Sequence, residues 1–188
     1  MTRRPTILTI AVAFLAVLPA VRAIALPLDD DDANRKNVEC FIDKENVLSP
    51  GVSLDPSSGT AVTPQPGVIE CHGKLDGAAP TGDGQVTEEA RYGTKDPDTC
   101  TSGGEGIGKF TASVPTTAGL KTFSVTFDFT YGEPSPRGCV VAGRFTGKGF
   151  HGNFDITPKK GDCVTAPITR IHTVDEIEFD EGYVFGSH

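Results

Sequence analysis

The sequence predicts an all-β fold: a single antiparallel barrel or curled sandwich of about eight strands, stapled by disulfides. Apolar residues recur with a period of two along much of the chain, and no segment beyond residue 25 has an apolar 3.6-residue period of helical length. The 22 glycines and 14 prolines disfavour long helices, and turn residues separate the alternating stretches at short intervals. Five cysteines, all beyond the N-terminal apolar run, suit an oxidising compartment.

The first 25 residues predict a secretory signal peptide. Arg3 and Arg4 precede an apolar run from Ile7 to Leu18, and small residues follow at Ala23 and Ala25. This run is too short to span a membrane as a stable helix, so we expect cleavage, preferably after Ala23. The product over residues 24–188 is therefore expected to be secreted and extracellular.

An acidic tail over residues 24–37 follows, with four consecutive aspartates and no apolar period. We interpret it as a disordered, solvated segment; the alternatives are a pro-segment cut after Arg35-Lys36 and a cation site on the aspartates. Residues 38–66 are expected to hold an outlying strand, Val38–Ile42, and a loop rich in Pro, Ser and Gly. The compact antiparallel β domain is then expected over residues 67–188.

The clearest element of that domain is a strand over Lys121–Tyr131. Its apolar residues all fall on one face, as in a half-buried strand: Phe123, Val125, Phe127, Phe129 and Tyr131. The same test predicts six more strands, in chain order: Val68–Leu75, Val86–Tyr92, Ile107–Val114, Val140–Thr146, Phe150–Thr157 and, with an interruption, Val164–Phe179. Glycines in these strands permit sharp coiling, which favours a barrel. Its interior is wide enough for one small ligand, but the 11 phenylalanines favour filling by side chains.

The stretch GKGFHG, Gly147–Gly152, has the G-x-G-x-x-G spacing of dinucleotide-binding loops. Such a loop needs a helix after its glycines, with the helix N-terminus facing the pyrophosphate. Here the residues after Gly152 alternate as in a strand and end at Pro158, so we expect a β-hairpin and no nucleotide. The hairpin should bury three side chains: Phe145, Phe154 and Ile156.

The charge of the chain disfavours nucleic acid as a partner. Cleavage after Ala23 would remove Arg3, Arg4 and Arg22, leaving 14 basic against 25 acidic residues and a formal charge of −11. So negative a surface repels phosphate groups, and the remaining chain has no basic cluster larger than Lys159-Lys160. We expect no nucleic acid and, after signal cleavage, no membrane; the expected partner is an extracellular ligand or protein of unknown identity.

No established catalytic motif appears: G-x-S-x-G, H-E-x-x-H, S-x-x-K and C-x-x-C are missing. We therefore assign no catalytic residue and expect no cofactor. His151 and Asp155 are the candidate metal ligands, because they share one strand face with Asn153, with about 7 Å between alternate positions. We favour the alternative that this face is merely solvated. The same two interpretations, a functional site or a solvated face, apply to two further groups: His172 with Asp175 and Glu176, and His72 with Glu70.

Five cysteines allow at most two bridges within one chain. Cys40 stands beside the acidic tail, outside the expected core, so we predict that it is unpaired and available for a disulfide-linked dimer. The expected strand neighbours favour bridges Cys71–Cys100 and Cys139–Cys163. The main competitor is Cys100–Cys139, because the strands between these two residues also predict a hairpin.

Four stretches share their Gly and Cys spacing with a known group of proteins: Val68–Gly73, Tyr92-Gly93 followed by Thr99-Cys100, Gly143–Gly147 with Gly149-Phe150, and Gly161–Thr165. In these the chain resembles small secreted, cysteine-containing β-rich proteins of actinobacteria, whose function is largely uncharacterised. The resemblance covers roughly residues 67–170. It implies an extracellular β-rich fold and supplies no catalytic residues.

These observations favour a secreted, non-enzymatic β domain that binds a ligand or partner. One alternative is a secreted hydrolase or isomerase that uses a His/carboxylate pair, which a deep cavity with converging polar groups would favour. The other is a secreted inhibitor or effector that acts through an exposed loop such as Gly132–Gly138, which a filled core would favour.

Overall fold

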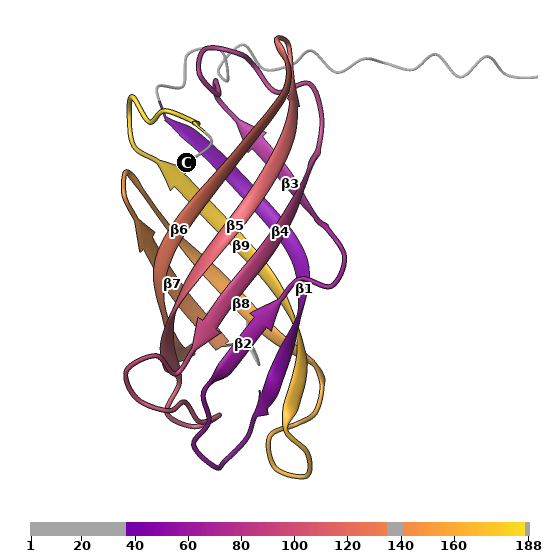
Figure 1. Cartoon of the computed structure of the whole chain (residues 1–188), viewed down its shortest axis with the longest axis vertical. Coiled ribbons are helices and arrows are strands. Elements are labelled where there is room, and N and C mark those ends of the chain that lie inside the picture. The colour runs from indigo at the N-terminus through magenta and orange to yellow at the C-terminus, as the bar shows by residue number, and fades with distance from the viewer. Residues whose placement is uncertain (1–36, 135–140, 187–188) are drawn as a thin grey trace, which may run out of the picture.

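The computed structural model of the chain describes residues 37–134 and 141–186 (Figure 1). They form nine strands in one antiparallel sheet: β1 Val38–Val52, β2 Gly59–Val62, β3 Gly67–His72, β4 Gly84–Tyr92, β5 Gly104–Thr116, β6 Gly119–Pro134, β7 Val141–Gly147, β8 Phe150–Lys160 and β9 Ile168–Phe179. Because β1 also pairs with β9, the sheet closes on itself. Within the described ranges there is no helix, and hence none long and apolar enough to cross a membrane. The predicted all-β barrel is confirmed.

The ring has eight positions although it contains nine strands, because β2 and β3 share one position. β2 pairs with β1 at Val47–Ser49, whereas β3 pairs with β1 at Glu39–Asp43. On their other sides both strands pair with β4. β2 and β3 therefore behave as one interrupted strand, with β3 towards the upper end of the barrel in Figure 1 and β2 towards the lower end.

The seven strands predicted from period-two alternation correspond to β3 to β9. The predicted hairpin is also present, since β7 pairs antiparallel with β8 and Gly149 takes a positive φ of 80° in the bend. β8 begins at Phe150, where a nucleotide loop would need a helix. Phe145 is buried as predicted, whereas Phe154 and Ile156 are only half-buried.

The prediction that Val38–Ile42 is an outlying strand before a compact domain was wrong. β1 pairs with β9 from Val38 opposite Phe179 to Val47 opposite Arg170 and, after a register shift, at Val52 opposite Ile168, and so closes the barrel. The sequence concealed this because two inward positions of β1 are polar, Lys44 and Asn46, which interrupts the apolar alternation. The expected signal peptide and most of the acidic tail lie outside the described residues.

The predicted disulfides were wrong as well. Cys40 bridges Cys71, directly across the β1–β3 pair with Cα atoms 4.1 Å apart, and Cys100 bridges Cys163 with Cα atoms 6.2 Å apart. The error about Cys40 followed from placing β1 outside the core. Because Cys100 and Cys163 pair with each other, neither is available to Cys71 or to Cys139, which lies outside the described residues. Cys40 is fully buried and bridged, so it offers no thiol for a dimer.

Phenylalanine rings lie over glycines of the neighbouring strands inside the barrel. The cross-strand pairs are Gly106 with Phe129, Gly108 with Phe127, Gly143 with Phe154, Gly152 with Phe145 and Gly147 with Phe150. A Cβ atom at Gly143 would stand 2.1 Å from Cζ of Phe154, and one at Gly108 would stand 2.3 Å from Cζ of Phe127. The missing side chains thus let the rings lie against the barrel wall.

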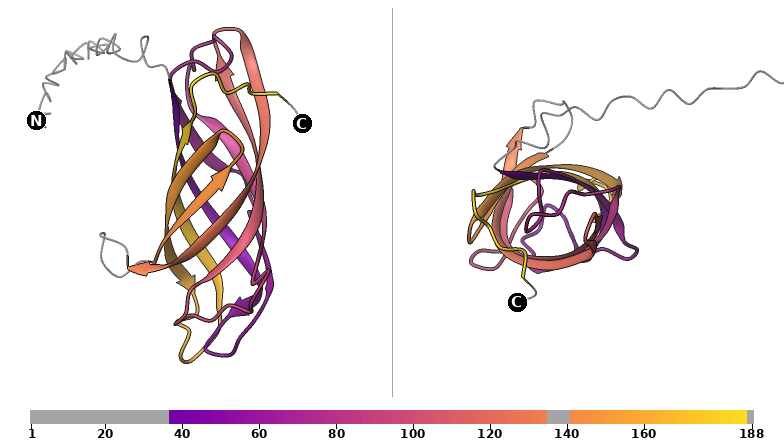
Figure 2. Two further views of the ribbon diagram at one scale, coloured as in Figure 1. Left: turned by 90° about the vertical axis from the view of Figure 1, so that its left-hand side faces the viewer. Right: turned by 90° about the horizontal axis from the view of Figure 1, so that it is seen from above.

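The interior has two parts along the barrel axis. The closed half, at the end where the C-terminal segment lies (Figure 2), is a packed core with these residues at its centre: Phe110, Phe123, Phe179 and Phe185. The open half, at the other end, has a smaller set of buried apolar residues: Leu48, Val52, Ala61, Ala90, Tyr92 and Ile171. The chain after β9 brings the ring of Phe185 within 5.0 Å of Phe123 and 4.8 Å of Phe179, measured between centroids, and so fills the closed half.

Candidate functional site

A cavity of about 160 Å³ lies in the open half of the barrel. Most of its lining is apolar: Leu48, Val52, Ala61, Ala90, Phe127, Phe129, Val141, Phe145, Phe154, Ile156, Pro158, Ile168 and Ile171. An engineered protein cavity of about 150 Å³ lined by Leu, Ile and Phe side chains binds benzene. The cavity is therefore large enough for a molecule built on one aromatic ring.

The cavity follows from the side chains that the strands point inwards. On one wall, β2 and β4 present the small side chains of Ala61 and Ala90, and Ala90 stands on β4 between the inward residues Glu88 and Tyr92. On the facing side, the ring of Phe154 packs edge-on to Phe129 at 6.2 Å and parallel to Phe145 at 6.1 Å, again between centroids. With Gly143 beneath Phe154, these rings line the cavity without filling it.

A charged floor, formed by Lys44, Glu88 and Asp175, separates the cavity from the closed half. On β1, Lys44 follows Ile42 of the closed half and precedes Leu48 of the open half. Its Nζ atom lies 2.8 Å from Oε2 of Glu88 and donates a hydrogen bond to Oδ2 of Asp175. All three side chains are buried.

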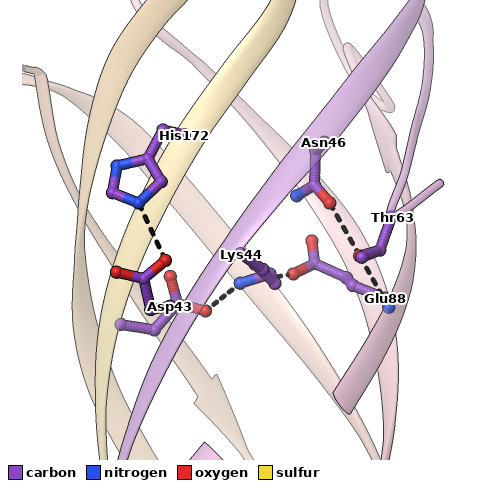
Figure 3. Close-up of polar contacts among 7 residues, drawn as sticks. Asp43, Lys44, Asn46, Thr63, Glu88 and His172 are labelled. Atoms are coloured by element: carbon purple, nitrogen blue, oxygen red, sulfur yellow. Dashed lines mark hydrogen bonds and ion pairs between the residues drawn. The ribbon is translucent and has the colours of Figure 1, made fainter. Parts of the chain in front are cut away.

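A second polar group, Asn46 with Thr63, holds the floor in position (Figure 3). The Thr63 hydroxyl donates to Oδ1 of Asn46 at 2.8 Å and accepts the backbone N–H of Glu88 at 2.9 Å. The backbone N–H of Thr63 in turn donates to the carbonyl of Glu88 at 3.0 Å. Thr63 lies between β2 and β3, so the break in this strand is tied to β4 where Glu88 enters the barrel.

The charges of the floor depend on one another. Burial disfavours the charged form of Lys44, but Asp175 and Glu88 outweigh it and raise the pKa of Lys44 above its ordinary value. Burial raises the pKa of Asp175, an effect that Lys44 opposes and Glu88 reinforces. Lys44 therefore stays protonated near neutral pH, which leaves it no free amine to act as a nucleophile or base.

Two buried polar atoms at the cavity have no hydrogen-bond partner within the described part of the chain. They are Oγ1 of Thr173 and Oδ1 of Asp175; both residues are 4% exposed, and the Thr173 hydroxyl lies close enough to the Asp175 carboxylate to oppose the rise in its pKa. A buried polar group without a partner costs about 1–3 kcal/mol. A molecule in the cavity that donates a hydrogen bond to Asp175 would remove this cost.

The cavity reaches the surface at the end of the barrel away from the floor. Thr101, Gly132 and Pro158 line it there and are also exposed to solvent. Cys100 lines it too, and its bridge to Cys163 ties the β4–β5 loop to the β8–β9 loop. The entrance is thus covalently fixed on one side.

Two tyrosines line this end and are anchored by their hydroxyl groups. Tyr131 donates to Oδ2 of Asp98 at 2.8 Å, and Tyr92 donates to the backbone carbonyl of Pro50. Asp98 is 2% exposed. Burial raises the pKa of the Asp98 carboxyl, and the hydrogen bond from Tyr131 opposes this.

The candidate metal ligands His151 and Asp155 lie on the outer face of β8, because Phe150 and Gly152 occupy its inner face. Nε2 of His151 lies 3.7 Å from Oε2 of Glu178 on β9. Among residues 37–134 and 141–186, no group of three or more His, Cys, Asp and Glu side chains is arranged to hold a metal ion. The structure therefore does not bring this pair together with a third ligand.

The other two histidines within the described residues also point outwards. Nε2 of His172 lies 2.9 Å from Oδ1 of Asp43 (Figure 3), and Nε2 of His72 lies 3.5 Å from Oε1 of Glu70. The sequence grouped His172 with Asp175, but the two residues face opposite sides of β9, and only Asp175 lines the cavity. None of these three described histidines lines it.

Sequence reasoning missed Lys44, Asn46 and Glu88. A signal for Glu88 was present, because it occupies an inward position of the predicted strand Val86–Tyr92, between Val86 and Ala90. A charged residue on the apolar face of a strand indicates either an error in the strand or a buried polar site. Lys44 and Asn46 had no such signal, because the predicted strand Val38–Ile42 ended before them.

Comparison with protein-family models, with curated proteins and with solved structures finds no match to this chain. The resemblance to secreted actinobacterial proteins stays a prediction.

Proposed function

We propose that the protein is a secreted, non-enzymatic binding protein that holds one small, mainly apolar molecule in the open half of its barrel. The observation that carries the proposal is the cavity, with an apolar wall, a charged floor and a connection to the surface. Pockets for small ligands commonly combine such a wall with a few converging polar groups.

The cavity is a volume that the protein leaves without packed side chains. It measures about 160 Å³ and opens to the surface at the end of the barrel away from the floor. The same chain fills its closed half with phenylalanine, so side chains able to fill such a volume are within its repertoire. A retained cavity next to a filled core supports a binding role.

Converging polar groups in a cavity are also a feature of enzymes. Here the ammonium of Lys44 is held by two carboxylates, and His72, His151 and His172 point away from the cavity. These contacts favour binding over the hydrolase or isomerase alternative. The loop alternative draws no support, since most of Gly132–Gly138 lies outside the described residues.

Export is part of the same proposal. The predicted signal peptide over residues 1–23 supports it, and so do the two disulfides, which persist in oxidising compartments.

Titration of the isotope-labelled protein with toluene, followed by amide NMR shifts, tests the binding role. We expect saturable shifts for residues around the open half, and their loss in the Ala90→Leu variant, whose side chain would occupy the cavity. Arg91→Leu is the matched control, because Arg91 is the next residue of β4 and lies on the outer face. The proposal is wrong if toluene causes no saturable shifts, or if Ala90→Leu leaves them unchanged.

A further inference from the structure

We infer that the natural ligand is a small organic cation: a protonated amine on an apolar body of about one ring, bound with its ammonium against Asp175. The inference rests on the proposed function and adds the chemical class of the ligand.

Acidic groups outnumber basic groups on the floor of the cavity. Among the described residues that line the cavity, Lys44, Glu88 and Asp175 are the only Asp, Glu, Lys, Arg or His. Two carboxylates face one ammonium, so the floor has a net charge of −1 when all three groups are ionised. An unbalanced buried charge is unfavourable, and a cationic ligand would balance it. An anionic ligand would add a second unbalanced negative charge.

The Asp175 carboxylate can accept a further hydrogen bond on the side of Oδ1. Oδ2 of Asp175 accepts a hydrogen bond from Lys44, while Oδ1 takes part in no hydrogen bond of ordinary geometry within the described part of the chain and has the hydroxyl of Thr173 as a neighbouring donor. An ionised carboxylate only accepts hydrogen bonds, so the ligand must supply the donor. A hydrogen bond between an ammonium and a carboxylate is about twice as strong as one between neutral groups. Lys44 is no competing site for an anion, because both carboxylates already hold its Nζ atom.

The wall of the cavity is rich in aromatic rings. The rings of Phe127, Phe129, Phe145 and Phe154 line the cavity, and the negative face of an aromatic ring attracts cations. At about 160 Å³ the cavity has room for one ring with a short chain. The charge of the floor, the hydrogen-bonding capacity of Asp175 and the aromatic wall thus favour the same ligand class.

Three probes of nearly equal shape test the inference by isothermal titration at neutral pH: 2-phenylethylamine, 2-phenylethanol and phenylacetate. They carry a positive charge, no charge and a negative charge. We expect the amine to bind at least tenfold more tightly than the alcohol, and phenylacetate to bind most weakly. Equal affinities of amine and alcohol, or tightest binding of phenylacetate, would overturn the inference and leave the proposed function standing. If no probe binds, both are wrong.

The Asp175→Asn variant locates the effect, because it removes the charge and keeps the shape. We expect it to weaken amine binding at least tenfold and to change alcohol binding less than threefold. Glu176→Gln is the matched control, since Glu176 is the next residue of β9 and is exposed; it should leave both affinities unchanged. If Asp175→Asn fails to fold, the same titrations are made with Glu88→Gln, and Glu89→Gln is its control. Unchanged amine affinity in the folded floor variant would overturn the inference.

Discussion

Strand β6 passes through both halves of the barrel, and its two ends face different surroundings. In the closed half, Phe123 and Val125 are 1% and 4% exposed, within a core completed by Phe185. In the open half, Phe129 and Tyr131 follow the same inward alternation but stay half-buried beside the cavity. A single apolar stripe therefore says which way side chains point, and does not say whether the volume they face is filled.

The difference between the halves arises from residues on other strands. The closed half receives Phe110 from β5, Phe179 from β9 and Phe185 from the segment beyond. The open half receives Ala61 and Ala90 opposite its aromatic wall. Whether the interior is filled thus depends on the inward side chains of all strands at the same height along the barrel axis.

Truncating one phenylalanine ring in each half should reveal the difference between the halves most strongly, as unequal losses of unfolding free energy. We expect Phe123→Ala to lower the free energy of unfolding by about 3–5 kcal/mol, because it opens a hole in a packed core. Phe154→Ala should cost about half as much, since its ring is half-buried beside an existing cavity. Urea unfolding of both variants measures the two values, and equal losses would contradict the distinction between the halves.

The floor between the halves should be the next most sensitive feature. Lys44→Met leaves two buried carboxylates without their cation, so we expect a loss of about 3–5 kcal/mol in unfolding free energy at neutral pH. Lys95→Met is the matched control: Lys95 pairs with Glu105 at 2.8 Å on the surface, and its loss should have no measurable effect. Similar unfolding curves for the two variants would show that the floor is not a coupled ion group.

The same variant predicts a pH dependence. The pKa of Lys44 is raised in the folded state, so its contribution is fully present below its ordinary value of 10.5 and is lost as the pH rises through the folded value. The stability difference between the wild type and Lys44→Met should therefore persist at pH 9 and shrink only in more alkaline solution. A difference that disappears between pH 7 and 9 would contradict the raised pKa.

Removing either disulfide should lower stability, but only removal of Cys100–Cys163 should change ligand binding. Removing Cys40–Cys71, which closes a loop of 31 residues, should cost about 4 kcal/mol in the chain-entropy model, and removing Cys100–Cys163, with 63 residues, slightly more. Only the second bridge reaches the cavity, through Cys100. We expect the paired Cys100→Ala and Cys163→Ala substitutions to change the affinity for 2-phenylethanol at least threefold in titrations, whereas the Cys40 and Cys71 pair leaves it unchanged. Equal effects on affinity would contradict this division.

The smallest expected effect on stability comes from Gly143→Ala. Its Cβ atom would push the Phe154 ring off the wall and into the cavity, at a cost of about 1–3 kcal/mol. Toluene binding, measured by the same NMR titration, should fall much more than stability does. Undiminished binding would mean that the Gly143–Phe154 pair does not keep the cavity open.

The features that the sequence predicted depend on residues close together in the chain, whereas the features that it missed depend on contacts between distant strands. Seven strands and the Gly149 bend depend on neighbouring residues, and alternation was enough to find them. The Cys40–Cys71 bridge depends on the register between β1 and β3, which no local pattern contains. The phenylalanine count predicted filling, and this holds for the closed half alone. Lys44, Glu88 and Asp175 converge from β1, β4 and β9, so their grouping required the closed barrel.

A crystal structure of the protein under xenon pressure tests the central claim most directly, because xenon enters apolar cavities irrespective of charge. We expect a xenon site in the open half, beside Phe129, Phe154 and Ile171, and none among Phe110, Phe123 and Phe179 in the closed half. An open half without xenon, or xenon bound within the closed half, would contradict the division of the barrel into a filled core and a ligand cavity.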